Sequence, residues 1–144
     1  MILLRQVFIF DAKVTNVVDA DTIDAVIDLG FNTSRTDRIR LFGINAYETR
    51  LSSTTTAQMK ELGLQGKVFL TDLILGRNVL VRTEPDREKY GRYLATVYML
   101  STDSSLVFNN VQDYQGALET VEGNTYVNIN KLVILKGYGV EQVY

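Results

Sequence analysis

The sequence predicts a mainly β domain in which five strands form the core and one longer and one short helix are appended. Short runs of alternating apolar and polar residues indicate the strands, and one long stretch rich in Leu, Met, Lys and Gln indicates the longer helix. A chain of 144 residues can bury a core without disulfides or structural metals. We therefore expect one domain over residues 1–144, because no repeat or linker divides it.

The first three strands are expected within the first 42 residues. Residues 1–10 are apolar and begin the first strand, and the alternation over residues 14–18 and 23–28 indicates half-buried strands with a bend between them. Residues 30–37 are polar and predict a loop that closes a hairpin. In the third strand, Ile39 and Leu41 share one face and Arg40 lies on the other.

The second half of the chain supplies the helices and two more strands. A helix is predicted over 55–75, weakened by the glycines at 63 and 66, and strands over 78–83 and 92–100. Residues 101–125 are polar and predict an inserted loop or hairpin. A short helix over 130–136 ends at Gly137. Five strands in this order suit a closed barrel of the OB type.

The composition excludes several kinds of chemistry. The chain has no Cys and no His, which excludes thiol nucleophiles, disulfides and imidazole bases, and leaves oxygen ligands that suit hard cations such as calcium or magnesium. The formal net charge is −2, so any affinity for phosphate must rest on local arginine clusters. No membrane-length apolar run and no leader are evident. We expect a cytoplasmic protein, or a secreted one if a leader was removed.

Three short segments carry residues suited to phosphate chemistry. Residues 19–22 (Asp-Ala-Asp-Thr) place two carboxylates on one side of an extended segment, where they could share a cation, although such triplets are also common in turns. Residues 40–48 combine a guanidinium, an amide oxygen and a carboxylate at a strand and its exit loop. Residues 89–92 (Lys-Tyr-Gly-Arg) add two cations in a turn that a hairpin alone would also explain.

In this order and spacing, residues 19–22, 40–48 and 90–92 resemble the motifs of the staphylococcal nuclease (thermonuclease) family. The helix after the second motif and the last helix, over 130–139, also have the places that this family gives them. The resemblance spans about residues 7–142 and omits the insertion at 101–125. It implies an OB-type barrel that hydrolyses phosphodiester bonds of DNA and/or RNA with calcium, with little sequence preference, and leaves 3′-phosphates.

The resemblance also implies a role for individual residues. Calcium would be bound by Asp21, Asn45 and the backbone carbonyl of Ala46, with Asp19 close by. Glu48 would be the general base, and Arg40 and Arg92 would bind the phosphate and stabilise its transition state. Lys89 and Tyr90 would lie near the substrate phosphate, and Tyr138 or Tyr144 would contact a base.

Three positions depart from the family pattern. The family usually has aspartate at the position of Asn45, proline at that of Tyr47 and glycine at that of Ala20. Asparagine keeps an oxygen but removes a charge, which predicts weaker metal binding and slower turnover. Tyr47 frees a backbone angle that proline would fix, so the segment before Glu48 is less rigidly set.

These departures keep a second function open beside the nuclease. A domain of the same fold with weakened catalysis would bind nucleic acid without cutting it, and a third alternative is an OB-type protein-interaction domain. Because residues Asp21, Arg40, Glu48 and Arg92 are all present, the sequence favours the active enzyme. We expect DNA and/or RNA as partners, no organic cofactor, no membrane contact and a monomer.

Overall fold

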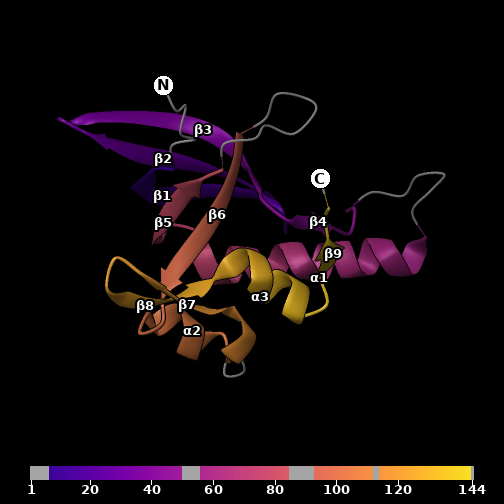
Figure 1. Ribbon diagram of the computed structural model, residues 1–144. Coiled ribbons are helices and arrows are strands. Elements are labelled where there is room, and N and C mark those ends of the chain that lie inside the picture. The colour runs from indigo at the N-terminus through magenta and orange to yellow at the C-terminus, as the bar shows by residue number, and fades with distance from the viewer. Residues whose placement is uncertain (1–6, 50–55, 85–92, 112–113, 144) are drawn as a thin grey trace.

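The computed structural model of the chain describes residues 7–49, 56–84, 93–111 and 114–143. Nine strands and three α-helices lie within these residues. Figure 1 shows a curved sheet above the long helix α1, with the shorter helices and the last hairpin at one end. In chain order the elements are β1 (Ile9–Asp19), β2 (Thr22–Gly30), β3 (Thr33–Leu41), β4 (Ile44–Ala46), α1 (Ala57–Ile74), β5 (Asn78–Thr83), β6 (Tyr93–Leu100), α2 (Ser104–Phe108), a 3-10 turn (Gln115–Ala117), β7 (Leu118–Val121), β8 (Asn124–Asn128), α3 (Ile129–Leu135) and β9 (Gly139–Glu141).

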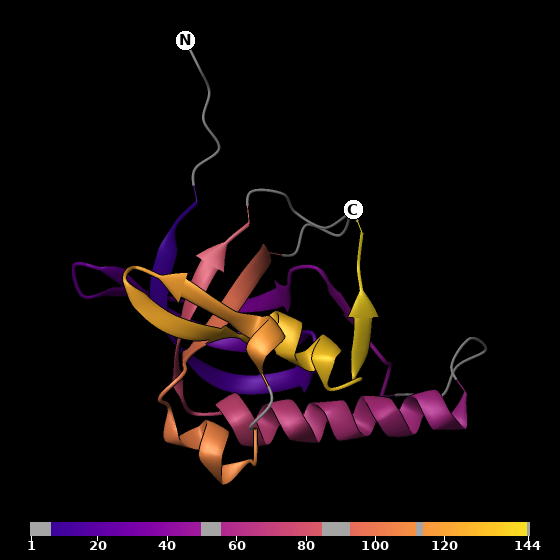
Figure 2. The same ribbon diagram turned by 60° about the horizontal axis from the view of Figure 1, so that its bottom comes forward.

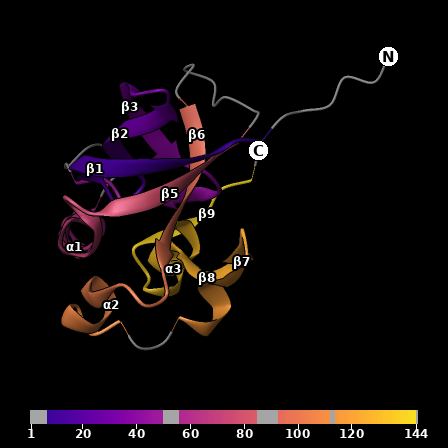
Figure 3. The same cartoon turned by 90° about the vertical axis from the view of Figure 1, so that its left-hand side faces the viewer.

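Five of these strands close into a barrel, as the sequence predicted. Antiparallel pairing runs from β3 through β2, β1 and β5 to β6, and a parallel pairing of β3 with β6 joins the two ends. Its interior is filled by apolar side chains that alternate along the strands, such as Val14, Ile23, Ile39 and Val97. The expected OB-type α+β fold is therefore confirmed, and Figure 3 shows the barrel strands crossing above α1.

The prediction of a loop over 30–37 was wrong. β3 begins at Thr33, and the turn is confined to residues around Phe31 and Asn32, which have positive φ angles of 52° and 58°. The hairpin of β2 and β3 extends beyond the barrel, where neither face is buried. An unburied strand needs no apolar alternation, so its sequence looks like a loop. The first strand begins at Ile9, after residues 7 and 8, and residues 1–6 of the predicted strand lie outside the described part.

Helix α1 confirms the predicted helix within two residues at its start and one at its end. The Thr56 hydroxyl accepts a hydrogen bond from the backbone N–H of Met59 at 3.1 Å, which caps the first turn. Leu70, Leu73 and Ile74 are buried against the barrel. Gly63 and Gly66 are buried as well, and they lie where neighbouring segments approach the helix most closely.

The insertion at 101–125 contains more regular structure than the sequence indicated. It forms helix α2, the 3-10 turn, and the β7–β8 hairpin, and β8 pairs with β6 so that the sheet continues past the barrel. α2 is fixed to α1 because the Ser105 hydroxyl donates to the Leu73 carbonyl at 2.5 Å and Leu106 is buried in the core. The insertion is thus built onto the end of α1 and the edge of the barrel (Figure 2).

The chain ends with α3 and β9, which return to the middle of the molecule. Asn128 caps α3 through its side-chain oxygen, and Gly137 follows the helix with a φ angle of 82°, as the predicted glycine C-cap requires. β9 then pairs with the short strand β4. The sequence did not predict this pairing, because strands of three residues are too short to show a pattern. Among the described helices, none is long and apolar enough to cross a membrane.

Candidate functional site

The candidate site lies where β2 begins, β3 ends and β4 follows. The register of β2 and β3 places Thr22 opposite Arg40, so the Asp-rich turn lies beside the arginine. The backbone N–H of Leu41 donates to the Asp21 carbonyl at 2.7 Å and fixes this alignment. Two of the three motifs found in the sequence therefore meet in the folded protein.

Asp21 is the most deeply buried acid of this site, with 6% of its surface exposed. The hydroxyl of Thr22 donates to Oδ1 at 2.8 Å, and the backbone N–H of Ala46 donates to Oδ2 at 2.9 Å. Buried polar groups require such hydrogen-bond partners. The contact with Ala46 also ties β4 to the β1–β2 turn.

The guanidinium of Arg40 lies among three oxygen atoms. Its Nη2 is 3.6 Å from Oδ2 of Asp21, 3.3 Å from Oδ1 of Asn45 and 3.5 Å from the carbonyl of Ile44. Only 15% of the Arg40 side chain is exposed, so the charge is held in a partly desolvated position. Oxygens from three separate residues thus converge on one cationic group.

The segment that carries Glu48 is pressed against α1 at a glycine. A Cβ atom added to Gly63 would lie 2.2 Å from the Glu48 carbonyl oxygen, a distance that no real side chain could tolerate. On the other side, the Tyr47 N–H donates to the Tyr138 carbonyl at 3.3 Å. The helix and the chain end therefore fix the backbone of Glu48, although proline is replaced at residue 47.

Asp19 lies beside this segment. Its Oδ1 accepts a hydrogen bond from the Thr49 hydroxyl at 3.2 Å. Asp19, Glu48 and Thr49 line one groove of about 550 Å³. Glu48 therefore lines an open, polar groove, and it follows Asn45 by three residues in the chain.

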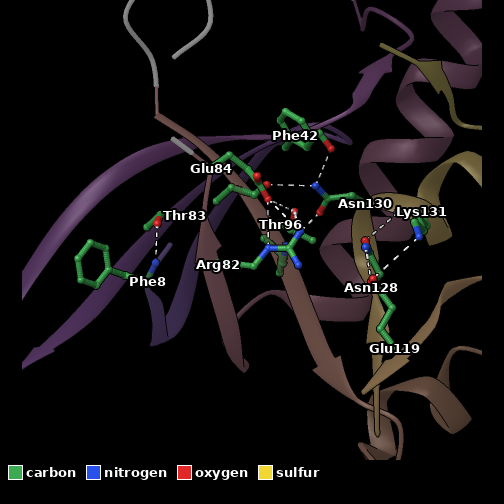
Figure 4. Close-up of polar contacts among 12 residues, drawn as sticks. Phe8, Phe42, Arg82, Thr83, Glu84, Thr96, Glu119, Asn128, Asn130 and Lys131 are labelled. Carbon is green, nitrogen blue, oxygen red and sulfur yellow. Dashed lines mark hydrogen bonds and ion pairs between the residues drawn. The ribbon is translucent and has the colours of Figure 1, made fainter. Parts of the chain in front are cut away.

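Asn130 supports the site, and the sequence did not single out this residue. It is 4% exposed; its Nδ2 donates to the carbonyls of Phe42 and Ala95 at 2.8 and 3.1 Å, and its Oδ1 accepts from the Val97 N–H at 3.1 Å. Figure 4 shows the bond to Phe42, which follows directly after Arg40 and Leu41. Asn130 thus joins α3 and β6 to the exit of β3. A polar residue inside an apolar helix pattern is the only sequence signal that could have indicated it.

Other predicted site residues lie elsewhere or outside the described part. Arg92, Lys89 and Tyr90 fall in residues 85–92, and Tyr144 is also outside the described residues. The Tyr138 ring packs on Phe69 of α1, with 5.3 Å between the ring centroids, and lines a different hollow from Glu48. Its contact with a base therefore remains a prediction without a supporting geometry.

The oxygen atoms of the site are of the types that bind a hard cation, but few of them carry a negative charge. Carboxylate, amide and carbonyl oxygens are the ligands that calcium prefers. Among the described residues, no three acids, histidines or cysteines lie together as a metal cluster. Of the oxygens that contact Arg40 Nη2 within the described residues, one is a carboxylate oxygen, that of Asp21. The Ala46 carbonyl, predicted as a ligand, makes no described contact that bears on this role.

Known proteins with similar sequences bear directly on this arrangement. A profile described as staphylococcal nuclease homologue matches residues 38–143, more than half of the chain. The chain belongs to this family. The family assignment agrees with the barrel, and it confirms the resemblance noted in the sequence.

Two curated relatives are also similar to this family member. The uncharacterized protein MJ1439 of Methanocaldococcus jannaschii is 29% identical over 113 residues, which cover 67% of this chain and 52% of the relative. Protein ParB of Escherichia coli is 32% identical over 87 residues, which cover 60% of this chain and 41% of the relative. The chain spans about half the length of these relatives or less.

Proposed function

We propose that this staphylococcal nuclease homologue hydrolyses phosphodiester bonds of DNA and/or RNA in a calcium-dependent reaction. The observation that carries this proposal is the convergence of Asp21, Asn45 and Ile44 oxygens on the Arg40 guanidinium. Arg40 is a cation suited to bind a phosphate, and Glu48, three residues after Asn45, is a carboxylate that lines an open groove.

The reaction needs three contributions that these residues can supply. A phosphodiester carries a negative charge that repels an attacking water, so the charge must be neutralised and the water must be oriented and deprotonated. Arg40 can donate two parallel hydrogen bonds to phosphate oxygens, and it keeps its proton near neutral pH. Glu48 acts as the general base. Arg92 is proposed as a second phosphate ligand from the sequence motif alone.

The proposed calcium ion would be held by Asp21, by Asn45 and by the carbonyl of Ala46, with Asp19 near it. When bound, such an ion neutralises phosphate charge and polarises a phosphoryl oxygen. In the structure, the Arg40 guanidinium occupies the point where the Asp21 and Asn45 oxygens converge. When calcium and the phosphate are bound, the guanidinium would turn away from these oxygens and toward the phosphate. Asp21 remains oriented by Thr22 and by the Ala46 N–H during this change.

A nucleic-acid-binding domain without cleavage is the second candidate function. One observation favours it: residue 45 supplies an amide oxygen, not a carboxylate, to the group of oxygens around Arg40, and calcium affinity depends on the number of charged ligands. Such a domain would keep Arg40 for phosphate binding and lose turnover. We place DNA and/or RNA as the partner in both cases, and we propose a cytoplasmic monomer.

The two functions differ in a cleavage assay. We would incubate the protein with labelled single-stranded DNA and with RNA, in calcium or in chelator, and include Glu48→Ala to exclude a contaminating nuclease. The proposed enzyme cuts in calcium, and the variant still binds but does not cut. Binding with no calcium-dependent cleavage would favour the non-cleaving domain, and cleavage that persists in Glu48→Ala would refute the role of Glu48.

A further inference from the structure

The groove that contains Glu48 also contains two cations that the proposed catalytic site does not use. Lys67 of α1 and Arg38 of β3 both line it, together with Asn16 of β1. The groove has a volume of about 550 Å³. Because Asp19 and Glu48 also line it, two positive charges oppose two negative charges there.

Arg38 is oriented by a neighbouring acid. Its Nε and Nη2 donate to the two carboxylate oxygens of Asp24 at 2.8 and 3.2 Å, and Asn16 donates to the same carboxylate at 3.2 Å. These two hydrogen bonds to Asp24 leave Nη1 of Arg38 without a hydrogen-bond partner among the described residues. Arg38 and Arg40 are two residues apart on β3 and therefore lie on the same face, about 6.8 Å apart along the strand.

Lys67 is placed by the close approach of α1. It lies four residues after Gly63, so it shares that helix face and lies about 6 Å farther along the axis from the Glu48 backbone. The preceding residue, Gly66, is close to Ala20 of the Asp-rich turn. Within the described part of the chain, Lys67 forms no ion pair, so its charge is uncompensated in the folded protein.

A polyanion could not enter a groove lined by two carboxylates unless cations offset their repulsion. Lys67 supplies such an offset, and Arg38, although it is paired with Asp24, keeps Nη1 available to donate to a phosphate oxygen. We propose that this groove binds the nucleic-acid strand beside the scissile phosphate, with Lys67 and Arg38 contacting the neighbouring phosphate. The inference rests on the proposed function for its substrate class. Lys67 would bind the strand and so hold the scissile phosphate in position.

The test is binding of a labelled single-stranded DNA decamer in chelator, measured by fluorescence anisotropy at several salt concentrations. We expect Lys67→Gln to weaken binding about fivefold to tenfold at low salt. The slope of log K against log salt should become shallower by about 0.7, because one phosphate contact to a single strand is lost. Lys67→Arg should restore most of the binding affinity and most of the salt slope. The matched control, Lys131→Gln, makes the same charge change on α3, away from the groove, and should change neither.

A second measurement shows whether the contact is to a neighbouring phosphate. If the variant cuts the decamer with a raised KM and cuts a dinucleotide, which has only the scissile phosphate, at the normal rate, the inference holds. Equal affinity and salt slope for Lys67→Gln and the unmodified protein would overturn it, as would equal losses on both substrates. The binding measurement needs no turnover, so an inactive protein with the expected binding loss would refute the proposed nuclease and leave the groove assignment standing.

Discussion

At the scale of single residues, the account depends on which oxygens surround the Arg40 guanidinium. In the structure Asp21 and Asn45 both contact Arg40, because the turn after β3 brings Asn45 back to Arg40 and the strand register places Thr22, next to Asp21, opposite Arg40. The roles that the sequence predicts for these three residues stay predictions. The sequence could not have indicated Asn130. That residue acts through backbone groups of Phe42, Ala95 and Val97, which lie 33 to 88 residues away in sequence.

Asn45→Asp should strengthen calcium binding by about tenfold or more. The substitution adds a second carboxylate to the oxygens around Arg40, and a unit charge a few ångströms from a divalent ion in a partly buried site is worth more than about 1.4 kcal/mol. Isothermal titration with calcium measures the change. Asn45→Ala serves as the opposite control, because it removes the oxygen and should weaken binding. An unchanged affinity in both variants would show that residue 45 is no ligand.

Asn130→Ala should lower the free energy of unfolding by about 3 kcal/mol. The substitution leaves the Val97 N–H and the carbonyls of Phe42 and Ala95 without the buried side chain that pairs with them. Urea denaturation measures the loss. Asn124→Ala, at an exposed position of β8, is the matched control and should stay within about 0.5 kcal/mol. A similar small effect at residue 130 would contradict the role assigned to it.

At the scale of elements, the site is fixed by how α1 meets the β4 segment. The sequence treated Gly63 and Gly66 as weak points of the helix, because glycine lowers helix stability. In the fold these residues allow the backbone of Glu48 and the side chains of Ala20 and Tyr138 to approach the helix. Periodicity can place a helix, but it does not say which segment will contact it, so this role was not predictable.

Gly63→Ala tests this contact. In an open helix the substitution would stabilise by about 1 kcal/mol, but here the new Cβ would lie 2.2 Å from the Glu48 carbonyl oxygen. We expect a net loss of about 1 to 3 kcal/mol in the free energy of unfolding and a drop in cleavage, since Glu48 must move.

Thermal denaturation and cleavage rates on the same samples measure both effects. Gly116→Ala is the control, because its Cβ would meet Leu135 only at 3.5 Å and its φ angle is ordinary. A Gly63→Ala protein that is more stable and equally active would show that α1 does not position Glu48.

At the scale of the whole molecule, the sequence predicted the elements that pack in the core, and it predicted few of the elements outside the core. The barrel strands bury apolar side chains in the core, which gives β1 an alternating pattern and β6 a continuous apolar run. The outer part of the β2–β3 hairpin and the insertion have no such pattern, because their strands are short or exposed. In these regions the predicted loop over 30–37 proved to be mostly strand, and the predicted loop or hairpin over 101–125 contains a hairpin together with helix α2.

The pH dependence of stability follows from the pair that orients Arg38. The hydrogen bonds from Arg38 hold the pKa of Asp24 below its ordinary value of 3.8. A carboxylate with a lowered pKa in the folded state stabilises the protein fully above that ordinary value, and this contribution is lost as the pH falls through the lower folded-state pKa.

Acid denaturation monitored by circular dichroism between pH 7 and 2 should therefore show a smaller loss of stability for Asp24→Asn than for the unmodified protein. Asp28→Asn, on the same strand without an ion pair among the described residues, is the control. Parallel curves for Asp24→Asn and the unmodified protein would contradict this linkage.

The most direct test of the central claim is a single-turnover rate for cleavage of single-stranded DNA at millimolar calcium, compared between the unmodified protein and Glu48→Gln. The isosteric amide keeps the shape of the groove but cannot accept a proton. We predict that the rate falls by about a hundredfold or more, since a positioned general base contributes about that much, while affinity for the DNA in chelator is retained. Equal rates for the two proteins would contradict the account.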